Sequence, residues 1–219
     1  MRNLWRVVVV VGHRPRMSEG LLLAGVDEVG RGCLFGPVVA AAVLVSPEAL
    51  TALVSLGVKD SKQLSAPQRQ TLVPLIQETV LGYGIGLATV AEIEQLNIRR
   101  ASLLAMKRAL LKLLQSPDRC LIDGRDRIPD LPWEQETVIR GDQSSPAIAA
   151  ASILAKVWRD DLIERLARKY PGYDLAQNKG YGTAKHRQAL QQFGLTRFHR
   201  PRFCRKSLSS GVFTESSPD

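Results

Sequence analysis

The sequence GVDEVGRG occupies residues 25–32 and follows an apolar run at residues 21–24. The apolar run predicts a β-strand, and the string after it predicts that this strand ends in acid and glycine. Two adjacent carboxylates, Asp27 and Glu28, are costly to place near a core unless a cation or solvent compensates their charge. The glycines on either side of Arg31 indicate unusual backbone angles or the close approach of a large group such as a phosphate or sugar. Taken alone, an Asp-Glu pair is more often a solvated turn.

The composition suits one globular domain with a sizeable core and an appendage. The chain has 219 residues, 45% of them hydrophobic, and its 30 Lys and Arg against 21 Asp and Glu give a formal net charge of +9. This charge favours nucleic acid as the partner, although a generic basic surface kept for solubility is the alternative.

The cysteines and histidines limit the possible chemistry. Three cysteines lie far apart without a Cys-x-x-Cys pair, which fits a reducing cytosol and predicts a cytoplasmic protein. Three histidines lack metal-ligand spacing, so any bound metal would be held by oxygen. The apolar run near the N-terminus is too short to span a bilayer and lacks a cleavage site, so we expect no membrane association. We interpret residues 1–20 as an extension without function, with Met17 as an alternative start.

The first half of the chain predicts further strands and two helices. Residues 38–45 form a continuous apolar run, expected to be a buried strand antiparallel to the first. Residues 59–62 predict a polar loop, and Ser65 with the glutamine three positions later resembles a capping box that opens a helix kinked by a proline. A third strand is expected over residues 80–90, and leucine spacing predicts a helix over residues 97–115.

The second half alternates strands and helices, which implies parallel pairing and therefore a mixed sheet. Residues 120–124 predict a strand that ends at Asp123, and residues 138–142 a strand that ends at Asp142. Ser145, followed by proline, predicts the start of a long helix to about residue 169.

The C-terminal part is basic. Residues 179–206 contain eight Lys and Arg, no acidic residue and interleaved aromatic rings, which favours nucleic-acid binding. Capping signals predict a helix from Thr183 to Gly194. We expect residues 207–219 to be a disordered tail.

The four acids are expected to form one site, since ligands of open α/β sheets gather beyond the carboxyl ends of strands. Converging carboxylates repel each other, and hard divalent cations relieve that repulsion. Asp27 and Glu28 are successive strand residues that point to opposite faces, so we expect the strand to bend, or Glu28 to contribute its backbone carbonyl. Individually, Asp123 and Asp142 are more often turn or cap residues.

Several motifs together resemble the ribonuclease HII family over about residues 21–206. They are GVDEVGRG, KDSKQLS, LIDG, RGDQ, IAAASILAKVWRD and NKGYGT, in the family's order and rough spacing. The resemblance implies a ribonuclease H-like mixed five-stranded sheet flanked by helices, with a core at residues 21–170 and a basic, helical, substrate-binding extension at residues 171–206. Asn178 departs from the family pattern, where histidine is usual, and Pro201 interrupts the basic segment.

The resemblance also implies the site. The four acids that match the family's catalytic and metal-binding positions are Asp27, Glu28, Asp123 and Asp142. The substrate contacts that we expect are Gly30, Arg31, Gly32, Ser61, Lys62, Ser152, Lys156 and Tyr181. For the phosphate contacts in this group, a solvated loop or helix residue is an equally good interpretation.

The activity implied is hydrolysis of the phosphodiester 5′ to a ribonucleotide in an RNA/DNA hybrid or in DNA, by a monomer that uses Mn²⁺ or Mg²⁺. Two such cations activate water and stabilise the leaving oxygen in enzymes of this type. Three alternatives remain at this point. A non-catalytic nucleic-acid binder gains nothing from four acids, another ribonuclease H-like nuclease need not carry both glycine motifs, and a phosphatase leaves the basic segment unexplained.

Overall fold

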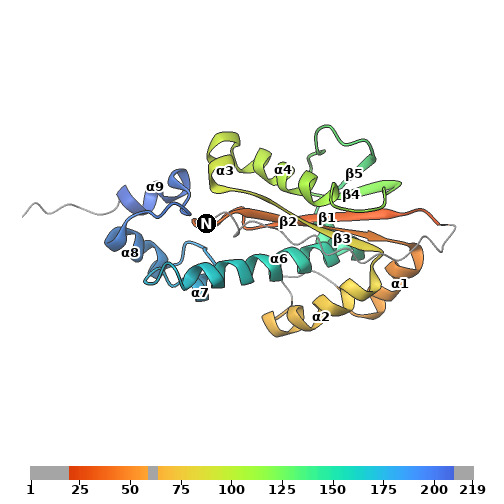
Figure 1. Ribbon diagram of the computed structural model, residues 1–219, viewed down its shortest axis with the longest axis horizontal. Helices are drawn as coiled ribbons and strands as arrows, with labels where there is room; N and C mark the ends of the chain where they lie inside the picture. The colour runs from red at the N-terminus through yellow and green to blue at the C-terminus, as the bar shows by residue number, and fades with distance from the viewer. Residues whose placement is uncertain (1–19, 59–63, 210–219) are drawn as a thin grey trace, which may run out of the picture.

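The computed structural model describes residues 20–58 and 64–209. They form one mixed five-stranded sheet with helices on both faces, as the sequence predicted (Figure 1). The strands are β1 (Leu23–Val29), β2 (Val38–Val45), β3 (Gly82–Ala88), β4 (Arg119–Asp123) and β5 (Glu134–Val138). Their spatial order is β3-β2-β1-β4-β5, and the first three pair antiparallel while β4 pairs parallel with both β1 and β5. The expectations for residues 1–19, 59–63 and 210–219 lie outside the described residues.

The helices divide into three groups. They are α1 (Pro47–Ser55), α2 (Ala66–Thr79), α3 (Val90–Leu96), α4 (Ile98–Leu110), α5 (Gly141–Ser144), α6 (Pro146–Ala167), α7 (Leu175–Asn178), α8 (Ala184–Phe193) and α9 (Pro201–Ser209). In Figure 1, α6 with α1 and α2 covers one face of the sheet, α3 and α4 cover the other, and α7 to α9 gather at one end. Within the described part of the chain, no helix is both long and apolar enough to cross a bilayer.

The position of β2 in the sheet explains why its sequence is apolar without interruption. It lies between β1 and β3, and both of its faces are covered. Val39, with the alternate positions that follow it, packs toward α6, while Val38 and its alternates pack toward α4. Both faces of a doubly covered strand must be hydrophobic, so the strand shows no polar alternation.

Helix α6 approaches the sheet closely at β1. A Cβ atom added to Gly25 would lie 2.3 Å from the backbone carbon of Ala147, so only glycine fits at this position. Ser145 caps the helix by accepting a hydrogen bond from the Ile148 N–H, and Pro146 follows it, as predicted. The close approach of Gly25 to Ala147 places the start of α6 beside β1, the strand that carries Asp27 and Glu28.

The C-terminal extension packs on the core through a shared apolar cluster, to which Phe35 and Ile163 contribute from the core and Tyr173 and Leu190 from the extension. Helix α8 begins and ends as predicted, with Thr183 as its N-cap and Gly194 as its C-cap. Helix α9 lies near α3 (Figure 1), where the Arg202 guanidinium is 3.5 Å from a Glu94 carboxylate oxygen. The extension is therefore joined to the core by packing and by charge.

Besides the strand expected at residues 138–142, which is found as β5 at Glu134–Val138, three predicted boundaries differ from the structure. A separate helix, α3, follows β3, because Thr89 and Glu92 form a capping box inside the region expected to be strand and loop. Helix α4 ends at Leu110 rather than near residue 115. Helix α9 reaches Ser209, three residues into the segment expected to be a disordered tail.

Candidate active site

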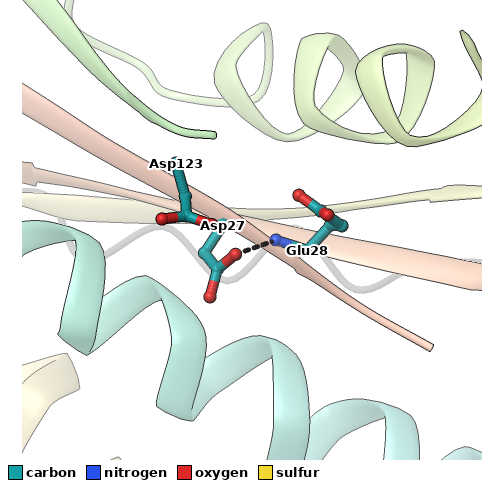
Figure 2. Close-up of side chains that lie close together, drawn as sticks. All are labelled: Asp27, Glu28 and Asp123. Carbon is teal, nitrogen blue, oxygen red and sulfur yellow. Dashed lines mark hydrogen bonds between the residues drawn. The ribbon is translucent and has the colours of Figure 1, made fainter. Parts of the chain in front are cut away.

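Three acidic side chains meet where β1 and β4 run side by side. The parallel register pairs Val26 with Ile122, and the next residues on the two strands are Asp27 and Asp123. One carboxylate oxygen from each of Asp27, Glu28 and Asp123 lies within 4.8 Å of the others. Figure 2 shows Asp123 reaching toward Asp27 while Glu28 leaves β1 on another side. The sheet itself therefore sets the separation of two of the three acids.

Our prediction of a bend in the strand at Asp27 and Glu28 is wrong. Both residues belong to β1, and they pair one-to-one with Ala41 and Ala40 of β2, with no extra residue in the ladder. The two side chains do alternate, as a regular strand requires. Glu28 nevertheless joins the group through its side-chain carboxylate, since its oxygen lies within the 4.8 Å cluster.

Burial makes the negative charge of Asp27 costly. Its side chain is buried, and this burial raises the pKa of the carboxyl well above its ordinary value, with further increases from Glu28 and Asp123. A hydrogen bond from Ser152 and one of 2.7 Å from the Glu28 N–H to Oδ1 oppose the shift. The site therefore holds Asp27 in place while leaving its charge poorly compensated.

Glu28 is compensated more strongly. Burial raises its pKa, but the Arg31 guanidinium, 3.0 Å from Oε1, works in the opposite direction. Asp123 accepts a 2.7 Å hydrogen bond at Oδ1 from the Gly141 N–H. That bond ties the start of α5 to the cluster.

Asp142 does not end a strand, contrary to our prediction. Strand β5 stops at Val138, Arg140 adopts a left-handed conformation with φ of 54°, and Asp142 lies in the short helix α5. Its side chain is buried, but it is not among the acids that lie within 4.8 Å of one another in the described residues. Asp142 follows Gly141, whose N–H is hydrogen-bonded to Asp123, so the backbone of Asp142 lies close to the three clustered acids.

The acids open into a cleft of about 500 Å³. Its walls contain six of the eight substrate contacts predicted from sequence, namely Gly30, Arg31, Gly32, Ser152, Lys156 and Tyr181. The other two, Ser61 and Lys62, lie outside the described residues. Residues from β1, α6 and the C-terminal extension thus share one surface with the carboxylates.

Tyr181 and Lys156 form one wall of this cleft. The Lys156 ammonium lies 5.5 Å from the centre of the Tyr181 ring and 3.0 Å from Oδ1 of Asp160. The tyrosine is 38% exposed and lines the cleft, so part of its surface is open to a ligand there. A flat ring beside a cation suits contact with a sugar-phosphate backbone.

Sequence reasoning missed three arginines near the cleft. Arg69 of α2 lines it, and nothing in the sequence distinguishes this residue from an ordinary helix-surface arginine. Arg159 and Arg200 are completely buried and donate to backbone carbonyls around the Gly30–Gly32 turn. A Cβ atom at Gly30, where φ is +88°, would lie 2.2 Å from Nε of Arg159.

The donor set fits a hard divalent cation. All three clustered side chains offer carboxylate oxygens, which Mg²⁺ and Mn²⁺ prefer. Burial and mutual repulsion raise the pKa of Asp27, and a cation would remove that penalty. The cleft leaves space beside the acids for a phosphate group.

Comparisons with known proteins agree with this geometry. The family model for ribonuclease HII matches residues 24–206. Ribonuclease HII of Acaryochloris marina is 61% identical over 188 residues, covering 85% of this chain and 95% of that protein. The Synechocystis protein of the same name is 60% identical and covers 86% and 99%. The crystal structure of ribonuclease H2 from Pyrococcus horikoshii aligns with a TM-score of 0.71 at 26% identity, covering 86% and 98%.

Proposed function

Since the chain belongs to the ribonuclease HII family and is an endoribonuclease that acts on RNA/DNA hybrids, we propose that the cleft beside β1 and β4 is its active site. The observation that supports this most strongly is the group of carboxylates from Asp27, Glu28 and Asp123 within 4.8 Å of one another. A non-catalytic nucleic-acid binder would be weakened by negative charge at this position, because the substrate backbone is itself anionic.

The family requires a divalent metal, and we assign Mn²⁺ or Mg²⁺ to Asp27, Glu28, Asp123 and Asp142. Asp142 is included because the adjacent Gly141 is hydrogen-bonded to Asp123. When bound, the metal would supply Lewis-acid stabilisation of the charge that develops on the phosphate. The carboxylates would hold the metal beside the phosphate, and the hydrogen bonds to Asp27 and Asp123 limit the movement of these two side chains.

Side chains on α6 and α2 would bind the phosphate. Lys156 and Ser152 lie one turn apart on α6 and both line the cleft, with Arg69 contributing from α2. Cationic and hydroxyl side chains of this kind position a backbone without reading its sequence. We propose that Ser61 and Lys62 also contact the phosphate, as the family resemblance implies.

Recognition of the ribose would depend on the Gly30–Gly32 turn and Tyr181. A 2′-hydroxyl both donates and accepts hydrogen bonds, and it distinguishes ribose from deoxyribose. The turn brings backbone groups to the cleft, and Tyr181 lines the same cleft. We assign cleavage to the 5′ side of the ribonucleotide, giving 5′-phosphate and 3′-hydroxyl ends.

Duplex binding would extend over the basic C-terminal residues 179–206. We propose that the enzyme acts as a monomer on hybrids and on duplex DNA that contains ribonucleotides. The three cysteines are unpaired thiols, which fits the reducing cytoplasm that we propose as its location.

The deciding experiment is cleavage of a labelled DNA duplex that contains one ribonucleotide, with and without Mn²⁺ or Mg²⁺. We expect one cut, 5′ to the ribonucleotide, that requires the metal. The all-deoxyribonucleotide duplex is the control and should remain intact. Cutting of both duplexes, or cleavage that survives chelation, would contradict the proposal.

A further inference from the structure

Two segments far apart in the sequence pair just behind the substrate cleft. Phe35 and His199 form an antiparallel β-bridge. On either side of it, the Gly36 N–H donates to the Phe198 carbonyl at 2.8 Å, and the Arg200 N–H donates to the Leu34 carbonyl at 2.8 Å. The chain that follows the Gly30–Gly32 turn is therefore attached to the loop that precedes α9.

Arg200 extends this attachment to the turn itself. Its side chain is fully buried and donates from Nη1 to the Arg31 carbonyl at 2.8 Å and from Nε to the Gly36 carbonyl at 2.9 Å. Its third nitrogen, Nη2, has no hydrogen-bond partner within the described residues. Burying a guanidinium without a carboxylate is expensive. Such a residue is poorly explained by packing alone.

His199, the residue before Arg200, reaches Tyr181 through a second histidine. The Thr196 N–H donates to Nδ1 of His199 at 3.0 Å, so the proton of neutral His199 lies on Nε2. That nitrogen is 3.1 Å from Nε2 of His186, whose other nitrogen, Nδ1, donates to the Tyr181 carbonyl at 2.8 Å. The hydrogen bonds thus run in one direction, from Thr196 to the backbone of Tyr181.

We infer that His199 and Arg200 are positioning residues, which hold Tyr181 and the Gly30–Gly32 turn at the separation that ribose recognition requires. Arg200 acts on the turn through the Arg31 carbonyl, and His199 acts on the tyrosine through His186. This inference rests on the proposed function, in which the turn and Tyr181 contact the ribose.

Two conservative variants test the inference. Arg200→Lys keeps the positive charge but cannot reproduce the fork that reaches two carbonyls. His186→Phe keeps a ring but removes the donor to Tyr181 and the acceptor for His199. The matched control is Arg165→Lys, the same substitution at an exposed residue of α6.

The measurements are kcat, KM and duplex affinity on DNA that contains one ribonucleotide. We expect each variant to lower kcat about ten- to a hundredfold, because small errors in position are costly in catalysis, while KM and affinity change less than about twofold. The control should match the original protein. Melting curves set an assay temperature at which every variant is folded. Should Arg200→Lys prove too unstable to assay, His186→Phe decides the outcome.

A double-mutant cycle separates positioning from general stability. If His186 acts through Tyr181, His186→Phe should have little further effect on kcat in a Tyr181→Ala background. Folded variants with the original kcat, or effects that multiply fully in the cycle, would overturn the inference. A Tyr181→Ala variant that itself retains the original kcat on this substrate would instead refute the proposed role of Tyr181.

Discussion

Asp27 and Asp123 occupy matching positions on two neighbouring parallel strands, one residue beyond the pair formed by Val26 and Ile122. Their spacing is consequently set by the backbone hydrogen bonds of the sheet. The backbone positions of the two acids cannot separate without breaking that ladder. The repulsion between them is therefore built into the fold, and a divalent cation is the natural way to offset it.

We predict that Asp27→Asn, Asp123→Asn and Asp142→Asn each lower turnover by more than about a hundredfold, since changes merely next to a metal ligand already cost about ten- to a hundredfold. Cleavage of the single-ribonucleotide duplex at saturating Mn²⁺ measures this. The far-UV spectrum should be unchanged. A variant with near-original turnover would remove that residue from the site, and Asp142 is the most informative of the three because it lies outside the cluster.

We also predict that Asp27→Asn stabilises the metal-free protein at neutral pH. A carboxyl whose pKa is raised on folding makes the folded state less stable as pH rises, so removing the charge should raise the free energy of unfolding. Thermal melting in chelator measures the difference, which should shrink as the pH falls. Added Mn²⁺ should stabilise the original protein more than the variant. Identical melting curves in chelator would show that Asp27 is already compensated.

Asp27 and Asp123 were predictable because β1 and β4 each contain an apolar run that leads into the acid, whereas the polar sequence of β5 gives no such signal. Asp142 was misplaced because Val138 and Ile139 also look like the end of a strand, whereas the left-handed Arg140 ends it earlier. No residue pattern marks Arg140 as left-handed. The capping box of Thr89 and Glu92, in contrast, is recognisable in the sequence, but Thr89 was included in the glycine-rich strand expected over residues 80–90.

The buried arginines could not be predicted from the sequence. Arginine is normally exposed, so Arg200 appeared to belong to the nucleic-acid-binding surface. Its guanidinium instead lies among backbone carbonyls of residues that are about 165 positions earlier in the chain. Only the folded chain brings those carbonyls together.

The burial of Arg200 changes which basic residues we expect to determine the salt dependence of duplex binding. Arg200 is buried and Arg202 is paired with Glu94, so the exposed Lys185 and Arg197 are better candidates. We predict that replacing both with glutamine flattens the plot of log affinity against log salt by up to about 0.9 for each phosphate that is no longer neutralised. The control is Arg99→Gln, which removes a cation already paired with Asp126. An unchanged slope would place the electrostatic interactions elsewhere.

The buried histidine pair predicts a loss of stability in mild acid. Burial, and then His186, lowers the pKa of His199 to about 4. Between about pH 6.5 and 4 the unfolded chain therefore binds a proton that the folded chain does not, and stability falls as the pH falls. The charged and titratable groups facing the pair are Asp174 and Tyr173. Burial lowers the pKa of His186 as well, and the Asp174 carboxylate partly opposes that shift.

The corresponding measurement is unfolding free energy against pH for the original protein and His199→Phe. The original protein should lose on the order of 2 kcal/mol more across this window than the variant does. Asp27 contributes with the opposite sign in both proteins, so it cancels in the comparison. Parallel curves would mean that His199 titrates normally in the folded state.

The glycines of the turn offer a test of how closely the substrate approaches. Gly32 has open space around its Cβ position, so Gly32→Ala should fold and melt like the original protein. Gly30 has a φ of +88° and no room beside Arg159, so Gly30→Ala should be destabilised by at least the roughly 1 to 3 kcal/mol that such backbone strain costs. Gly57→Ala, with positive φ, open space and no place among the residues that line the cleft, controls for strain.

If the turn contacts the ribose directly, the methyl group of Gly32→Ala must meet the substrate, because among the described residues only its chain neighbours lie within 4 Å of that position. We therefore predict a normal melting curve together with a loss of about tenfold or more in kcat/KM on the single-ribonucleotide duplex, as a misplaced reacting group would give. Gly57→Ala should show the reverse pattern, with lower stability and unchanged kcat/KM. Full activity in Gly32→Ala would mean that the sugar does not approach this side of the turn, and recognition would then depend on Tyr181 and the backbone of residues 30 and 31.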